Sequence, residues 1–212
     1  MLKDKNALVT GARGGIGRAI CARLIKEGAT VIATDLTPNG SYAKKVEDGA
    51  IFLSMDVTSE ASVKSAYKEV LNKINSLNIL VNAAGIEIEK TIEDTTLEEW
   101  NRSFAVNVTG TFLTSKYGLP LLRKAAEKGT NSSIINFGSY DGFIADPGLA
   151  AYCATKGAVH ALTRAMACDH GPEGIRVNAI CPGYIDTPML SGFFSGEGSG
   201  GGGKTINQLD QA

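Results

Sequence analysis

The sequence lacks both a surplus of charge of either sign and any long apolar run. Its 212 residues include 21 lysines and arginines against 22 aspartates and glutamates, for a formal net charge of -1. Without a basic surplus the chain has no electrostatic footprint for DNA or RNA, so we expect no nucleic-acid partner. A membrane-spanning helix needs about 20 apolar residues in a row. The apolar runs here are broken within a few residues, so we expect no membrane partner.

Cysteine and histidine are also scarce. The chain has 4 cysteines without a C-x-x-C pair, and its 2 histidines are His160 and His170. Neither arrangement suits a zinc site. We therefore predict free thiols in a reducing compartment, no bound metal, and histidines with surface or packing roles. The first residues run directly into a strand-like segment and leave no room for a signal peptide, which predicts a cytoplasmic protein.

Two kinds of segment alternate along the chain. Short apolar or β-branched runs, typical of strands covered on both faces, occur at residues 7–9, 30–33, 51–53, 79–81, 133–136 and 175–180. Longer amphipathic stretches, typical of helices, occur at residues 16–26, 59–74, 96–126 and 149–170. Alternation of this kind predicts a parallel sheet built from right-handed crossovers. The stretch at 96–126 begins with a capping box, Thr96 and Glu99, and is too long for one ordinary helix without a bend.

The C-terminal residues depart from this pattern. We assign residues 1–190 to a single domain, in keeping with the length of the chain. Residues 195–203 are almost entirely glycine and serine, so we assign residues 191–212 to a flexible loop or a partial lid. The link between Asp35 and Ile51 leaves room only for a short helix, at residues 42–47.

A glycine-rich turn, TGARGGIG at residues 10–17, follows the first predicted strand. Glycines let the backbone turn tightly and approach a pyrophosphate, which then lies against the positive end of the next helix. Because the turn joins a strand to an amphipathic helix, it favours a dinucleotide site over a plain tight turn.

Asp35 ends the second predicted strand, where an acidic residue accepts hydrogen bonds from the adenosine ribose hydroxyls. Its carboxylate would repel a 2′-phosphate, and neither Leu36 nor Thr37 supplies a cation to bind one. Arg13 is the residue that leaves NADP open. We predict NAD as the cofactor, with NADP as the alternative.

Tyr152 and Lys156 lie at i and i+4 in the last predicted helix and therefore share a face. Tyrosine has an ordinary pKa near ~10 and is a poor base at neutral pH. A neighbouring ammonium group favours the phenolate and lowers that pKa. The pair alone would also suit an exposed surface. Ser139, at the end of the fifth predicted strand, favours a catalytic site because its hydroxyl can hydrogen-bond a substrate oxygen.

With these residues in place, the chain resembles a short-chain dehydrogenase/reductase over residues 5–189. The family's Asp-Val after the third strand is matched by Asp56-Val57, and its Pro-Gly after the sixth by Pro182-Gly183. Its Asn-Asn-Ala-Gly segment reads NAAG at residues 82–85 and departs at the second residue. The resemblance implies an α/β fold, a Rossmann-type doubly wound parallel sheet of strand order 3-2-1-4-5-6 with helices on both faces.

The resemblance also implies a catalytic tetrad of Asn107, Ser139, Tyr152 and Lys156. Tyr152 would be the general acid in reduction and the general base in oxidation. Lys156 would lower the pKa of Tyr152 and contact the nicotinamide ribose, while Ser139 would position the substrate oxygen. Asn107 would hold a water that relays protons from Lys156. A local irregularity at Asn107 would also explain why its helix is overlong.

The expected cofactor contacts extend well beyond the glycine turn. By the resemblance, Asp56 and Val57 contact the adenine and Thr187 holds the nicotinamide carboxamide. The full set of expected cofactor-binding residues is Gly11, Arg13, Gly15, Ile16, Gly17, Asp35, Asp56, Val57, Asn82, Ala83, Gly85, Tyr152, Lys156, Pro182, Gly183, Ile185 and Thr187.

The substrate is predicted only as a small alcohol or ketone. Residues 140–144 and the pair Tyr184-Ile185 are expected to line its pocket, with Asp141 as a partner for a second substrate hydroxyl. The expected substrate contacts are Ser139, Asp141, Tyr152 and Tyr184. A polyol, a sugar derivative, a small hydroxyketone and a steroid all stay open, and we rank polar hydroxylated substrates first.

Two further hypotheses stay beside the main one. The family continues past Pro-Gly with a lid, a helix and a seventh strand, and we expect that strand to be missing here. The first alternative hypothesis is therefore a shortened Rossmann fragment that binds nucleotides or oligomerises without turnover. A sugar-nucleotide epimerase is disfavoured because it needs a larger C-terminal domain. Family members commonly form dimers or tetramers, so the resemblance implies a homodimer or homotetramer that uses the helices around Asn107 and Tyr152.

Overall fold

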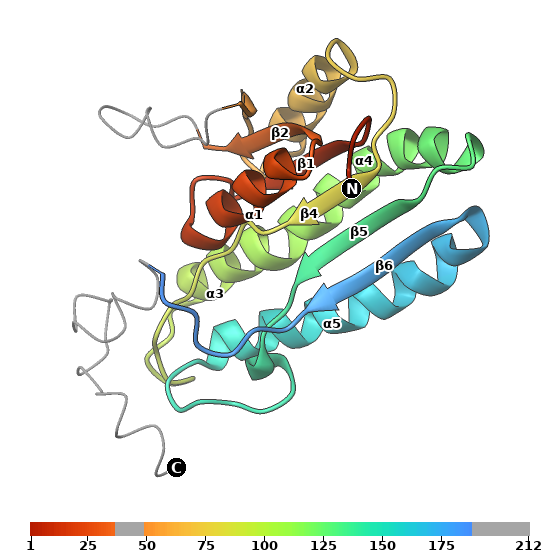
Figure 1. Ribbon diagram of the computed structural model, residues 1–212. Helices are drawn as coiled ribbons and strands as arrows, with labels where there is room; N and C mark the ends of the chain where they lie inside the picture. Colours follow the sequence, from red (N-terminus) through yellow and green to blue (C-terminus); the bar gives the residue numbers. More distant parts are fainter. Residues whose placement is uncertain (37–48, 188–212) are drawn as a thin grey trace.

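A computed structural model describes residues 1–36 and 49–187 of the chain. Within them, six parallel strands form one sheet in the order β3-β2-β1-β4-β5-β6 (Figure 1). The strands are β1 Asn6–Thr10, β2 Thr30–Asp35, β3 Ile51–Ser54, β4 Ile79–Asn82, β5 Ser132–Phe137 and β6 Ile175–Ile180. The predicted fold class and strand order are confirmed. The helix expected at residues 42–47 and the loop expected at 191–212 lie outside the described residues.

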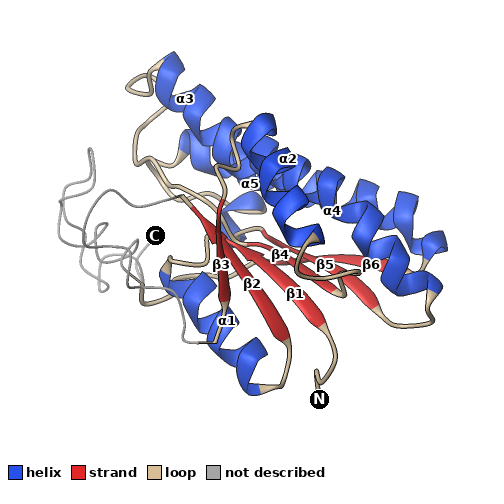
Figure 2. Ribbon diagram, turned by 90° about the horizontal axis from the view of Figure 1, so that it is seen from above, coloured by secondary structure: helices blue, strands red, loops and turns tan. Residues whose placement is uncertain are grey.

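Helices cover both faces of the sheet. They are α1 Gly15–Lys26, α2 Glu60–Leu71, α3 Leu97–Phe104, α4 Gly110–Glu127 and α5 Ala150–His170. Viewed from above, α1 lies on one face, and α2, α4 and α5 lie on the other (Figure 2). Each begins within a residue or two of its predicted start, apart from α4, which continues from α3. Among residues 1–36 and 49–187, no helix is both long and apolar enough to cross a membrane.

The hydrophobic core is divided by the sheet into two clusters. Leu8 and Leu80 of the central strands pack with Leu122 of α4 in the larger cluster. Val9 packs on the opposite face with Cys21 of α1. All of these side chains are fully buried, as expected for central strands that crossover helices cover on both sides. Alternate residues of β1 therefore face different helices, which fixes the register of the strand.

The long helical stretch after β4 is interrupted as the sequence predicts. Thr96 caps α3 and forms the expected capping box with Glu99. Between α3 and α4 the chain makes a π-helical segment, η2 Ala105–Thr109, which contains Asn107. Single π-helical turns of this kind occur often at functional sites. The expected irregularity at Asn107 is therefore confirmed.

The centre of the sheet is where the strand order reverses. β1 and β4 are neighbours, and the chain leads from β1 toward β2 on one side and from β4 toward β5 on the other. In doubly wound sheets ligands bind in the crevice at this point, outside the carboxyl ends of the strands. The glycine turn, the segments after β4 and β5, and the segment after β6 all leave the sheet at this edge.

Candidate active site

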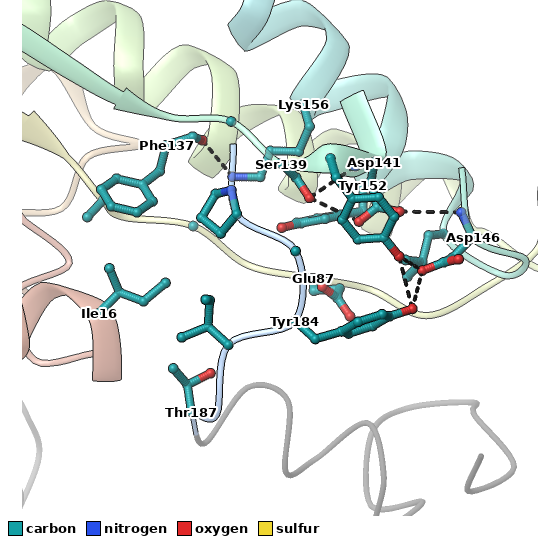
Figure 3. Close-up of a pocket in the computed structure, with 18 residues that line it drawn as sticks. Ile16, Glu87, Phe137, Ser139, Asp141, Asp146, Tyr152, Lys156, Tyr184 and Thr187 are labelled. Atoms are coloured by element: carbon teal, nitrogen blue, oxygen red, sulfur yellow. Dashed lines mark hydrogen bonds between the residues drawn. The ribbon is translucent and has the colours of Figure 1, made fainter. Parts of the chain in front are cut away.

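A pocket opens at the carboxyl ends of the strands, next to the start of α1 (Figure 3). Twelve of the residues expected to bind cofactor or substrate line it, together with six that were not in that set. The lining residues are Ile16, Ala83, Gly85, Glu87, Phe137, Gly138, Ser139, Tyr140, Asp141, Asp146, Leu149, Tyr152, Lys156, Pro182, Gly183, Tyr184, Ile185 and Thr187. Segments far apart in the sequence thus converge on one cavity.

The glycine turn is packed too tightly for side chains at two positions. Gly11 has a left-handed φ of 62°, and a Cβ there would lie 2.7 Å from the Ala83 carbonyl oxygen. A Cβ on Gly17 would lie 2.1 Å from the Gly11 carbonyl oxygen. The residue before α1, Gly14, offers no side-chain cap, and the first turn of the helix carries no acidic residue. Its positive end and first amide groups therefore suit a phosphate group, so these residues fit a dinucleotide pyrophosphate.

Asp35 lies directly beside this turn. Its Oδ2 accepts a hydrogen bond from the Arg13 amide at 3.0 Å, and its Oδ1 accepts one from the Leu36 amide at 2.8 Å. The Arg13 guanidinium donates to the Leu36 carbonyl at 3.3 Å. The Asp35 carboxylate and the Arg13 guanidinium group thus both lie at the end of β2. The carboxylate suits ribose hydroxyls, whereas the cation suits a 2′-phosphate.

The residues after β3 form a tight turn. Asp56 Oδ1 accepts hydrogen bonds from the Thr58 amide at 2.9 Å and from the Thr58 hydroxyl at 2.7 Å. Val57 is 9% exposed, and a Cβ on Gly110 would lie 2.8 Å from its Cγ2. The adenine contact expected of this pair stays a prediction.

The NAAG segment after β4 is held mainly by internal hydrogen bonds. The Asn82 side chain is buried, donates to Ser115 and Asn136, and accepts from the Thr114 hydroxyl at 2.6 Å. It therefore faces α4 and β5. The amides of Ala83 and Ala84 both donate to the Thr10 hydroxyl at 3.1 Å, which fixes this segment against the glycine turn. Ala83 and Gly85 line the pocket.

Tyr152 and Lys156 reach the pocket from the same face of α5. The Lys156 ammonium lies 5.3 Å from the centroid of the Tyr152 ring. It donates a hydrogen bond to the Phe137 carbonyl at 2.8 Å, and the residue is 6% exposed. The carbonyl at the end of β5 thus fixes the direction of the lysine side chain, next to the tyrosine.

Burial controls the protonation of both groups. It raises the pKa of Tyr152 above its ordinary value, and the charge of Glu87 raises it further, while the Ser139 hydroxyl lowers it. Burial also lowers the pKa of Lys156 to about 8. The pKa of Tyr152 was expected to be lowered by the ammonium group, but it is raised. The cost of desolvating the phenolate outweighs the attraction between the phenolate and the ammonium group. At neutral pH the Tyr152 hydroxyl is therefore protonated.

Ser139 is held in place by Asp141. The Ser139 hydroxyl donates to Asp141 Oδ2 at 3.0 Å and accepts from the Asp141 amide at 3.2 Å. Asp141 is 7% exposed, and its Oδ1 accepts from the Asp146 amide at 3.3 Å. The carboxylate predicted to meet a second substrate hydroxyl is thus already engaged in orienting Ser139.

Asn107 lies just behind the pocket. Its amide group donates to the Ile86 carbonyl at 2.9 Å and to the Thr155 hydroxyl at 3.0 Å, and its Oδ1 accepts from the Ile86 amide at 2.9 Å. A Cβ on Gly85 would lie 3.4 Å from Asn107 Oδ1 and 3.8 Å from Lys156 Nζ. The side chains of the asparagine and the lysine therefore both lie near Gly85, and the proton relay between them stays a prediction.

The loop after Ser139 is tied to the segment after β6. The Asp146 carboxylate accepts hydrogen bonds from the hydroxyls of Tyr140 and Tyr184, the latter at 2.6 Å. Both tyrosines and Asp146 line the pocket. Phe143 and Ile144 were also expected to line it, but they are 72% and 66% exposed. That expectation is wrong because the chain makes a 3-10 turn, η3 Tyr140–Gly142, which directs the next two residues outward.

One residue assigned only a surface or packing role supports the site directly. His160 is 5% exposed, and its Nε2 accepts from the Ser139 amide at 3.4 Å and lies 3.2 Å from Cys181 Sγ. Burial lowers its pKa, which keeps the imidazole neutral and able to accept. A Cβ on Gly138 or on Gly142 would lie 2.3 Å from its ring. The two glycines on either side of Ser139 are the only feature of the sequence that indicates a large side chain packed against this loop.

Comparisons with known proteins agree with this architecture. The family model described as short chain dehydrogenase matches residues 5–198. A meso-2,3-butanediol dehydrogenase of Serratia marcescens is 36% identical over 193 residues, covering 90% of this chain and 75% of the relative. An NADP-dependent (R)-specific alcohol dehydrogenase of Lentilactobacillus kefiri is 36% identical over 195 residues, covering 89% and 76%.

A solved structure is similar as well. The crystal structure of a 3-ketoacyl-(acyl-carrier-protein) reductase from Brucella melitensis, complexed with NADH, has a TM-score of 0.84 and 36% sequence identity. The similarity covers 90% of this chain and 80% of that one. The family model alone matches far more than half of the residues, and the sheet order and pocket agree with it. The chain therefore belongs to the short-chain dehydrogenase family, a family of oxidoreductases.

Proposed function

We propose that the chain transfers a hydride between NAD(H) and a secondary alcohol or ketone, with Tyr152 as the proton-transfer group. One observation carries the proposal: Ser139, Tyr152 and Lys156 line a single pocket that Ile16, at the start of α1, also lines. A pyrophosphate bound at the glycine turn directs the rest of the dinucleotide toward this pocket. The nicotinamide, when bound, supplies or takes up the hydride, and the protein supplies alignment and proton transfer.

We assign the side chains the roles that the family resemblance implies. In reduction the carbonyl carbon receives a hydride while the Tyr152 hydroxyl donates its proton to the carbonyl oxygen. Oxidation is the reverse and requires the Tyr152 phenolate, which takes up the hydroxyl proton of the alcohol as the alcohol carbon gives up a hydride. Because the pKa of Tyr152 is raised, its hydroxyl is suited to donate a proton to a ketone at neutral pH. Ser139 holds the substrate oxygen. Lys156 contacts the nicotinamide ribose, and Asn107 holds the water that passes protons to solvent.

The relatives support this reaction class. One is named for a butanediol and another for alcohols, which agrees with a small alcohol or ketone as the substrate. The expected homodimer or homotetramer and the cytoplasmic location stay predictions.

Asp35 provides the test of the cofactor. We propose NAD as the cofactor because the Asp35 carboxylate lies next to the turn, although Arg13 lies beside it. Asp35→Ala should weaken NADH binding about tenfold, as expected for the loss of a hydrogen bond to a charged acceptor. It should also reduce the preference for NADH over NADPH. Nicotinamide fluorescence titrations with both cofactors measure the two affinities.

Asp35→Asn is the matched control, because it keeps an acceptor for the ribose and removes only the charge. It should retain more NADH affinity than the alanine variant while it accepts NADPH equally well. If both variants keep the preference of the unaltered chain, Asp35 does not select the cofactor.

The reaction itself is tested with the full chain, NAD or NADH, and a panel of secondary alcohols and ketones. Cofactor oxidation or reduction that depends on the alcohol or ketone supports the proposal. Saturable NADH binding without turnover of any panel member would instead favour a nucleotide-binding protein that has lost catalysis.

A further inference from the structure

The substrate side of the pocket is acidic. Three carboxylate residues, Glu87, Asp141 and Asp146, line it, and Lys156 is its one lysine or arginine among the described residues. That ammonium group already donates to the Phe137 carbonyl. The acidic residues come from two separate segments, one after β4 and one after β5, so folding gathers them at this point. Like charges this close together repel an anionic ligand in a partly desolvated cavity.

Two of the three carboxylates already have hydrogen-bond donors within the protein. Asp141 accepts from the Ser139 hydroxyl and from the Asp146 amide. Asp146 accepts from the hydroxyls of Tyr140 and Tyr184. Their negative charge contributes to the pocket, but their oxygens are committed to holding its walls together.

Glu87 differs from both. Within residues 1–36 and 49–187, no hydrogen bond or ion pair joins its carboxylate to another residue, although its charge acts on both Tyr152 and Lys156. Figure 3 shows its side chain among those that line the cavity. The Glu87 side chain is partly buried. A ligand that fills the cavity excludes water from its carboxylate, and a donor group on that ligand offsets the cost of this desolvation.

We propose that Glu87 selects the substrate of this enzyme: it accepts a hydrogen bond from a donor group on the carbon next to the reacting one, and the acidic pocket rejects anionic substrates. This inference rests on the proposed hydride transfer and narrows its substrate class. The donor is either a hydroxyl, as in a vicinal diol, or an ammonium group, as in an amino alcohol. Carboxylates and phosphates are excluded by charge.

The protonation of Glu87 gives this selection a pH dependence. Burial raises the pKa of Glu87 to about 7. The charged or titratable groups that interact with it are Glu89, Asp141, Asp146, Lys156, Tyr152 and Tyr184. Because the pKa is raised, the carboxylate forms only as pH increases through about 7. The preference for a donor-bearing substrate should therefore grow between pH 6 and 8, as estimated from that pKa.

The experiment uses four probes with the same carbon skeleton: 2-butanol, 2,3-butanediol, 3-amino-2-butanol and 3-hydroxybutyrate. We measure kcat/KM for each with the full chain and with Glu87→Gln. In the unaltered chain the diol or the amino alcohol should exceed 2-butanol by about tenfold or more, as for a hydrogen bond to a charged group. Glu87→Gln should reduce that ratio by a similar factor and raise the relative use of 3-hydroxybutyrate.

Glu89→Gln is the matched control, since it removes the same charge two residues away, from a side chain outside the pocket lining. It should leave the ratios within about twofold, a difference well below one hydrogen bond. Preference for the diol identifies a hydroxyl as the donor, and preference for the amino alcohol identifies an ammonium group. Equal use of 2-butanol and both donor-bearing probes overturns the role of Glu87 while leaving hydride transfer intact. No turnover of any probe despite NADH binding overturns the proposed function itself.

Discussion

Replacing Tyr152 with phenylalanine should lower kcat by about 10²- to 10⁴-fold, the range of a general acid–base group, and leave NADH affinity nearly unchanged. The substitution removes one hydroxyl, whose hydrogen-bond partner is the side chain of Ser139 in the same pocket. The packing of the aromatic ring stays, so the melting temperature should move little. Steady-state turnover of a ketone, together with a fluorescence titration with NADH, separates the loss of chemistry from a loss of binding.

Tyr117→Phe is the control for this variant. Tyr117 lies on α4, donates to Glu60 at the surface, and does not line the pocket. Its loss should leave turnover unchanged. If Tyr152→Phe kept more than a tenth of the turnover, another group or a water would have to move the proton, and the assignment of Tyr152 would be wrong.

The sequence could predict the sheet because its signals are local. Each strand is a short apolar run that needs no distant partner to be recognised, and alternation with helices fixes the crossovers. Asn107 is a less obvious success. The stretch that begins at Thr96 is too long for one regular helix, which predicts an interruption. The interruption is the π-helical segment that contains Asn107, and the side chain of Asn107 hydrogen-bonds Ile86 and Thr155.

The failures concern quantities that depend on tertiary packing. The pair Tyr152 and Lys156 predicts a lowered tyrosine pKa from one pairwise charge. Burial depends on every surrounding element, and it reverses the direction. Glu87 was missed for a similar reason. The residues after Gly85 carry no recognisable pattern, and only the fold shows that this carboxylate faces Tyr152 and Lys156.

His160 and the loop beside it illustrate the same limit. Spacing between the two histidines excluded a metal pair but could not show that one imidazole would pack against Gly138 and Gly142. Phe143 and Ile144 were placed in the pocket because they follow a strand end. One tight turn, closed by a hydrogen bond from the Phe143 amide to the Tyr140 carbonyl, directs them away from it.

Gly17→Ala should have the largest effect on the cofactor site. Its new Cβ would lie 2.1 Å from the Gly11 carbonyl oxygen, 2.8 Å from the Gly11 carbonyl carbon and 2.9 Å from Ala12 Cα. All three atoms belong to the backbone, so no side chain can rotate to make room. The turn must open or α1 must shift, and we expect this to lower the free energy of unfolding by about 1–3 kcal/mol. NADH affinity should fall by at least about tenfold, which corresponds to a loss of ~1.4 kcal/mol in binding free energy.

Gly171→Ala is the matched control for the stability measurement. A Cβ there would meet no atom within 4 Å apart from its two neighbours in the chain. Its φ of -56° is right-handed, and contact of the new Cβ with the Pro172 ring adds only a small local cost. Urea unfolding should therefore give nearly the same free energy as for the unaltered chain, and NADH titration the same affinity. Wild-type stability together with wild-type NADH affinity in Gly17→Ala would contradict the close packing of the turn. Reduced stability with unchanged affinity would mean that the turn supports the fold but does not hold the dinucleotide.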